Sequence, residues 1–365
     1  MRASVVLVTG AAPAAMAATQ LSLLWDLPHA VAVRHHIDLD RGVLERVVSD
    51  LGGVVEREEV TLEHACVSCA LREDVLPTLD RLARDGRWRT IVAQLPVGAE
   101  GEQVCSVLAW DPALARRLKV AAVVAAVDGA SVVEDLLGDD TLADRGLASS
   151  HDDERGLGEV ACSMVEYADV VVAHGVDEAA VSSTSGTARA LLQVLARPDV
   201  PVVQGADLLA GADLLQRPPH QHARTRAWSS HLRDAPVPPA PRDDVWTLDL
   251  HADAPFHPER LLEHLEELAS GPFRTRGCFW LPTRPDQALL WEGAGGHLAI
   301  GAGEAWGRRP RRTRLTYVGV GSPPAHLAAA FESLLLAPAA YGPGIAWHLA
   351  EDGFEPWLGP LRDVA

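Results

Sequence analysis

The sequence lacks an apolar run long enough to cross a membrane. A membrane-spanning helix needs about 20 predominantly apolar residues, and no stretch of this chain approaches that length. The first ten residues carry one basic residue and a short apolar run ending in Gly10, which is typical of an opening core strand rather than a secretory signal. We therefore expect a soluble, cytoplasmic protein that does not contact a membrane.

Cysteine usage is ordinary, and lysine and arginine are fewer than aspartate and glutamate. The five cysteines among 365 residues are too few for a dense disulfide framework, so in a reducing compartment we expect thiols or metal ligands. The formal net charge of −18 repels phosphates at long range, which argues against direct DNA binding over a broad face. The exception is the basic cluster, residues 308–312 (RRPRR), which is either a solvated loop or a contact for RNA or an acidic partner.

The composition predicts a globular protein of about two domains, because 48% of the 365 residues are hydrophobic and 22% charged. Strand patterns alternate with helical patterns through residues 1–215. This alternation predicts an α/β domain with a parallel sheet covered by helices on both faces. The expected strands are residues 5–8, 31–33, 54–62, 90–93, 120–127, 168–172 and 201–203; the expected helices end at residue 24 or cover 71–82, 103–110 and 157–167.

Residues 216–243 interrupt this pattern with a polar, proline-rich run, which predicts an exposed linker. Its histidines, His220, His222 and His231, are either solvated linker residues or loose metal ligands. Order resumes in residues 244–365, where the pattern predicts a smaller α+β domain. The expected strands there are residues 246–250, 277–281, 288–291 and 315–320, and the expected helices are 258–268 and 324–336.

Cys66 and Cys69 are the first candidates for chemistry. Two cysteines three residues apart can place both sulfurs on one cation, and His64 can add a nitrogen, which together are ligands that zinc prefers. Apolar residues at helical spacing over 71–82 put the pair at or just before a helix N-terminus, where the dipole lowers a thiol pKa. The alternative is that both cysteines are small apolar side chains at the start of a helix.

A strand followed by Gly10 and a helix is where a phosphate-binding loop would lie. Such a loop needs glycines, so that backbone N–H groups reach the phosphates, and then lysine and Ser/Thr. Residues 10–17 read GAAPAAMA, so Met16 and Ala17 stand at the lysine and Ser/Thr positions. Methionine cannot neutralise phosphate and alanine cannot ligate magnesium, so we expect little or no nucleotide hydrolysis.

Several motifs in a fixed order carry a family resemblance. They are the Gly10 loop and residues 66–74 (CVSCALRED), 152–155 (DDER), 166–172 (EYADVVV), 255–260 (PFHPER), 277–286 (GCFWLPTRPD) and 317–321 (YVGVG). In this combination the chain resembles the CobW-type family of metal-chaperone GTPases, most closely in its C-terminal half. The resemblance implies a P-loop GTPase-like domain, a CobW-type α+β domain, GTP and magnesium as cofactors, and a role in zinc or cobalt allocation.

The family's motifs are incomplete here. Its Cys-x-Cys-Cys motif keeps Cys66 and Cys69 but has Ser68 between them, which removes one soft metal ligand. Its guanine-reading Asn-Lys-x-Asp motif falls on residues 174–177 (HGVD), where only Asp177 remains, and its acidic Thr/Ser-Gly segment reads QLPVG. The resemblance thus implies a member with little GTP hydrolysis, whose remaining nucleotide contacts are Gly10 and Asp177.

Two further pairs of polar residues each have a functional and a structural interpretation. His35 and His36 follow the strand at 31–33, at the expected ligand edge of the sheet, where they contact metal or nucleotide or lie on the surface. Arg72 and Asp74 match the family pattern, but they can also simply cap the helix and pair on it.

The resemblance leaves several functions open. An actinobacterial branch with the same CVSC variant is associated with zinc scarcity and with recruiting a hibernation factor to ribosomes. This implies a zinc-responsive adaptor whose partner is the ribosome or the factor. The alternatives are an active GTP-dependent metallochaperone that inserts zinc or cobalt into a metalloprotein client, and a structural paralogue whose cysteines are core residues.

Overall fold

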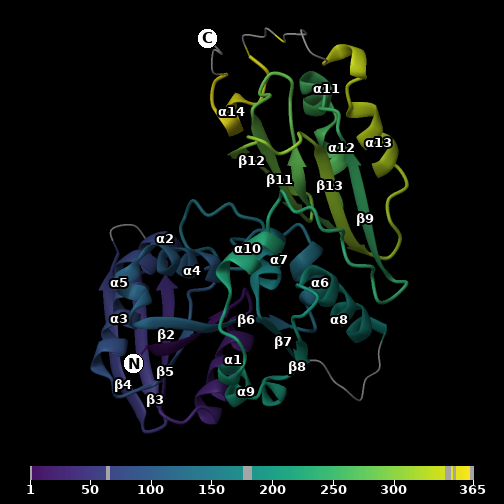
Figure 1. Ribbon diagram of the computed structural model, residues 1–365. Helices are drawn as coiled ribbons and strands as arrows, with labels where there is room; N and C mark the ends of the chain where they lie inside the picture. The colour runs from purple at the N-terminus through teal and green to yellow at the C-terminus, as the bar shows by residue number, and fades with distance from the viewer. Residues whose placement is uncertain (1, 63–65, 176–182, 342–346, 348–350, 362–365) are drawn as a thin grey trace. The chain divides into compact units, whose positions relative to one another are not determined.

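The computed structural model describes residues 2–62, 66–175, 183–341, 347 and 351–361 (Figure 1). The chain divides into two compact units. The first unit comprises Met1–Asp135 and Asp140–Ser229, and the second comprises Leu136–Asp139 and Ser230–Ala365. Among the described helices, none combines the length and the apolar character needed to cross a membrane.

The first unit is built on an eight-stranded sheet of order β4-β3-β2-β5-β1-β6-β7-β8. The strands from β2 to β8 in this order are parallel, which confirms the predicted sheet. The sheet also has an antiparallel extension, because β3 and β4 join the edge of β2 as a hairpin. The strands are Ala3–Thr9 (β1), Ala30–Asp38 (β2), Val43–Asp50 (β3), Gly53–Thr61 (β4), Thr90–Gln94 (β5), Leu118–Asp128 (β6), Val170–His174 (β7) and Val202–Gln204 (β8).

Helices cover both faces of this sheet, as the sequence predicted (Figure 1). In β1, Val5 and Leu7 pack with α3 and α4 on one face, whereas Val6 and Val8 pack with α1 and α9 on the other. One strand serves two cores because successive side chains point to opposite faces. The helical segments are Pro13–Asp26 (α1), Val67–Ala70 (α2), Leu71–Val75 (η1), Leu76–Asp85 (α3), Gly101–Trp110 (α4), Pro112–Ala115 (α5), Val132–Leu137 (α6), Leu157–Tyr167 (α7), Ser183–Leu195 (α8), Ala206–Leu208 (η2), Gly211–Gln216 (α9) and His222–Trp228 (α10).

The second unit contains a five-stranded antiparallel sheet of order β12-β11-β10-β13-β9. Alternate residues such as Phe279, Trp291 and Tyr317 form a core with α11 and α13. This is the predicted α+β domain, with β12 added. Its elements are Val245–Ala252 (β9), Pro258–Glu263 (α11), Leu265–Ala269 (α12), Phe273–Phe279 (β10), Gln287–Ala294 (β11), His297–Ala305 (β12), Thr313–Val320 (β13), Leu327–Leu334 (α13), Pro338–Ala340 (η3) and Glu355–Leu358 (α14).

The run predicted to be a linker, residues 216–243, is divided between the two units at Ser229/Ser230. Its first part carries α10, and the His220 side chain is only 2% exposed. His220 Nδ1 lies 2.8 Å from Asp169 Oδ2, and its Nε2 lies 3.1 Å from the Tyr167 hydroxyl. These bonds to α7 and to the residue just before β7 hold the segment against the first unit, which the local composition does not indicate.

The basic cluster, residues 308–312, is largely neutralised within the second unit. Arg311 pairs with Asp286 at 3.2 Å, and Arg309 lies 3.6 Å from Glu304. Arg312 bonds the Asp234 carboxylate. This pairing favours the interpretation as a solvated loop over that as a contact for RNA or an acidic partner.

Candidate functional site

The cysteine pair lies at the start of helix α2, as the helical spacing of the apolar residues after it predicted. Cys66 is the N-cap residue with extended backbone, and its Sγ accepts a hydrogen bond from the backbone N–H of Cys69 at 3.4 Å. Cys69 is buried and Cys66 is half-buried. The third predicted ligand, His64, lies outside the described residues.

The expectation of a lowered thiol pKa is wrong for Cys69. A hydrogen bond with Cys66 raises the pKa of the Cys69 thiol, and burial and the nearby charges of Cys66 and Glu73 act in the same direction. The Arg72 guanidinium, 3.9 Å from Cys69 Sγ, opposes them only weakly. A metal that binds here must therefore displace a proton from the pair.

The donor set of the pair fits zinc, because two thiols one helical turn apart give two sulfur ligands and Cys66 is partly open. A structural zinc site needs four ligands. Over the described part of the chain, no group of three or more His, Cys, Asp or Glu residues is arranged to hold a metal ion. Further ligands must come from residues outside that part, from movement, or from a partner.

A buried charge network anchors the helix that follows the pair. Asp74 lies in η1, a π-helical turn, and is only 4% exposed. Its carboxylate lies 2.9 Å from His35 Nε2, accepts from the Thr78 hydroxyl at 3.3 Å, and bonds Arg46. His35 comes from β2 and Arg46 from β3, so one carboxylate joins the cysteine-bearing segment to two strands. A π-helical turn within a helix is frequently found at functional sites.

The histidines of β2 differ in their surroundings. The predicted strand ends at residue 33, but pairing with β3 extends β2 to Asp38 and so places His35 and His36 within it. His35 is buried against Asp74, whereas His36 is exposed, since neighbouring strand residues face opposite sides. The network of His35, Asp74 and Arg46 could not be predicted from the sequence pattern, because β3 was not recognised as a strand.

The Gly10 loop joins β1 to α1 without a phosphate-binding side chain. A Cβ atom at residue 10 would lie 2.4 Å from the carbonyl oxygen of Ala126, so this close approach requires glycine. The Met16 side chain is fully buried, and its Cγ lies 3.0 Å from that Cβ position. At the place expected for a phosphate-binding lysine, a thioether therefore packs against the loop, and Met16 and Ala17 offer neither a cation for phosphate nor an oxygen ligand for magnesium.

The start of the segment predicted to read guanine, residues 174–177, is tied to helix α1. His174, at the end of β7, has Nε2 2.8 Å from the hydroxyl of the buried Thr19. Burial lowers the pKa of His174, although the charges of Asp128 and Asp207 oppose the shift. Asp177, the predicted guanine contact, lies outside the described residues.

The fold and site define a class of protein: a P-loop GTPase-like α/β unit with a cysteine pair, followed by an α+β unit. The chain belongs to the CobW family. Residues 36–203 match the CobW/HypB/UreG nucleotide-binding domain, and residues 245–335 match the cobalamin synthesis protein CobW C-terminal domain. The first match begins after the Gly10 loop.

Similar proteins include zinc-related ones. The zinc chaperone Rv0106 of Mycobacterium tuberculosis is 30% identical over 301 residues, which cover 79% of this chain and 71% of that protein. The zinc-regulated GTPase metalloprotein activator 1 of Dictyostelium discoideum is 22% identical over 254 residues, covering 66% and 53%. The Zn(II)-bound YjiA GTPase of E. coli aligns over 92% of this chain and 99% of its own, with 16% identity and a TM-score of 0.39.

Proposed function

We propose that this chain is a zinc-homeostasis protein of the CobW family that works as an adaptor, with little or no GTP hydrolysis. Cys66 and Cys69 sense or carry zinc, and His64 is a candidate third ligand. The names of the relatives, a zinc chaperone and a zinc-regulated GTPase metalloprotein activator, support zinc as the metal.

The observation that carries the proposal is the buried Met16 at the lysine position of the Gly10 loop. Phosphoryl transfer in P-loop enzymes depends on positioning and on charge stabilisation by that lysine and by the magnesium held at the next residue. Met16 and Ala17 supply neither. The family match that begins only at residue 36 also supports the proposal.

In this proposal the chain acts by binding a partner protein. A family member that does not turn over nucleotide acts through what it binds, and the resemblance to the hibernation-factor-recruiting branch suggests the partner. In this proposal the zinc state of the cysteine pair controls recruitment of a hibernation factor to the ribosome under zinc scarcity. The competing proposal is GTP-dependent insertion of zinc or cobalt into a metalloprotein client.

A calorimetric titration with GTP and magnesium separates the two proposals. We expect no binding heat above that of diluting GTP into buffer, with or without one equivalent of zinc, because the loop lacks its phosphate-neutralising lysine. ATP titrated in the same way is the matched control for weak, non-specific nucleotide contact. Saturable binding of GTP but not ATP, followed by release of phosphate, would establish the GTP-dependent metallochaperone instead.

A further inference from the structure

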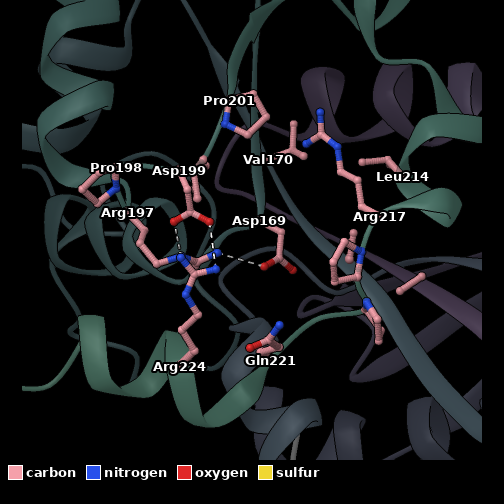
Figure 2. A pocket seen from close by; sticks show the side chains of 15 residues that line it. Asp169, Val170, Arg197, Pro198, Asp199, Pro201, Leu214, Arg217, Gln221 and Arg224 are labelled. Carbon is pink, nitrogen blue, oxygen red and sulfur yellow. Dashed lines mark hydrogen bonds and ion pairs between the residues drawn. The ribbon is translucent and has the colours of Figure 1, made fainter.

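A cavity of about 520 Å³ opens in the first unit, near the amino ends of β6, β7 and β8 (Figure 2). Its floor includes Ala121 and Ala122 of β6 and Val170 of β7, and Pro201 lies just before β8. Parallel strands all begin at this edge of the sheet, whereas the Gly10 loop follows the opposite, carboxyl end of β1. The cavity is therefore separate from the place where a nucleotide would bind.

Two carboxylates in the cavity wall are already committed to partners. Asp199 accepts from Arg197 at 2.8 Å and lies 3.0 Å from Arg224 (Figure 2). Asp169 is held by His220 at 2.8 Å, by the backbone N–H of Val123 at 2.9 Å and by Arg197 at 3.3 Å. Two arginines and two aspartates thus balance one another on this side of the cavity.

Arg217 supplies the remaining charge. Its guanidinium forms no ion pair with any residue that the structure describes, and Figure 2 shows it across the cavity from Asp199, with no bond drawn to the other lining residues. With three arginines against two aspartates, the lining carries one uncompensated positive charge, in a chain whose formal net charge is −18. The exposed amide of Gln221 adds a neutral donor at the rim.

The other walls are apolar and stiff. Pro198, Pro201, Pro218 and Pro219 line the cavity together with Val170, and the ring of proline fixes its own backbone angle. The volume lies in the range typical of small-molecule sites, and it exceeds what an inorganic anion would fill. A ligand that fits has one anionic group for Arg217 and an apolar body for the prolines.

We propose that this cavity binds a small organic anion, whose carboxylate or phosphate group pairs with Arg217 and whose apolar part packs on the proline walls. A planar guanidinium forms two parallel hydrogen bonds with either group, which gives both affinity and orientation. The site is independent of the cysteine pair and of the proposed zinc function.

Titration of the full chain with benzoate and with phenyl phosphate, at constant ionic strength, tests this proposal. We expect one equivalent of at least one of them to bind, and the stronger of the two identifies the anionic group. Neutral benzamide should bind more weakly. Arg217→Gln should weaken the binding by about tenfold or more, because a charge-assisted pair is lost.

Arg57→Gln is the matched control, since Arg57 is also an exposed arginine of the first unit with no ion pair in the described residues, and it lies on β4. This variant should bind like the wild type, and both variants should show unchanged thermal unfolding. The proposal is overturned if neither aromatic anion binds, if Arg217→Gln binds as tightly as the wild type, or if orthophosphate binds equally well, which would indicate an adventitious ion only.

Discussion

Replacing both Cys66 and Cys69 with alanine is expected to lower the zinc affinity of the purified protein by at least about a hundredfold, because two soft sulfur ligands are removed from one ion. The two thiols share one turn at the start of α2, so neither alone can hold zinc tightly. Competition against a chromophoric zinc chelator measures the change. The bound stoichiometry should fall from one ion per chain toward zero.

Cys105→Ala is the matched control for this variant. Cys105 is a buried core thiol of α4, and burial raises its pKa to about 12, so it stays protonated and is not expected to bind metal. The control should keep the zinc affinity of the wild type. If the double variant instead binds zinc with unchanged stoichiometry, the cysteines are core residues, as the structural-paralogue interpretation holds.

Asp74→Ala is expected to cost the most stability among substitutions near the cysteine pair. Removing this carboxylate leaves His35 without its hydrogen bond and takes one of three carboxylate partners from the buried Arg46, which still pairs with Glu56 and Glu58. Leaving a buried charge wholly unpaired costs about 3–5 kcal/mol, and this is the upper bound here because Arg46 keeps two glutamates. Urea unfolding measures the loss as a lower midpoint. Asp85→Ala, which removes an exposed pair with Arg87, should leave the midpoint nearly unchanged.

Asp74 should also make the free energy of unfolding fall at acid pH. Burial acts to raise the pKa of Asp74, but the hydrogen bond and charge of His35 and the charge of Arg46 outweigh it, so the folded-state pKa is lowered. The stabilisation is therefore present above the unfolded pKa of about 3.9 and is lost as the pH falls through the lower folded value. The stability difference between wild type and Asp74→Ala should shrink over that window; a constant difference would contradict the ionic account.

The elements that could be predicted correctly are those whose sequence pattern involves only neighbouring residues. The apolar run at residues 5–8 could be recognised as a core strand, and Cys66 at the start of a helix, because each depends on a few neighbouring residues. The strand β3 (VLERVVSD) was missed because its apolar and polar residues come in pairs and do not alternate one by one. Without β3, the extension of β2 through His35 and the burial of Arg46 could not be foreseen.

Contacts between residues far apart in the sequence explain why the structure differs from the predicted linker. His220 lies in a proline-rich run that reads as a linker, yet it is buried against Asp169 and Tyr167, which are 51 and 53 residues away along the chain. Nothing in the local composition identifies those partners. The helix predicted over residues 258–268 similarly divides at His264, whose non-helical backbone separates α11 from α12.

Affinity capture with the tagged chain, from zinc-starved and zinc-replete cells, tests the adaptor function most directly. The account predicts that ribosomal proteins and a hibernation factor are enriched in the zinc-starved sample without added GTP, and that the enrichment changes in the double variant of Cys66 and Cys69. Enrichment of a zinc-dependent or cobalt-dependent enzyme instead, only in the presence of GTP, would contradict it and establish a metallochaperone.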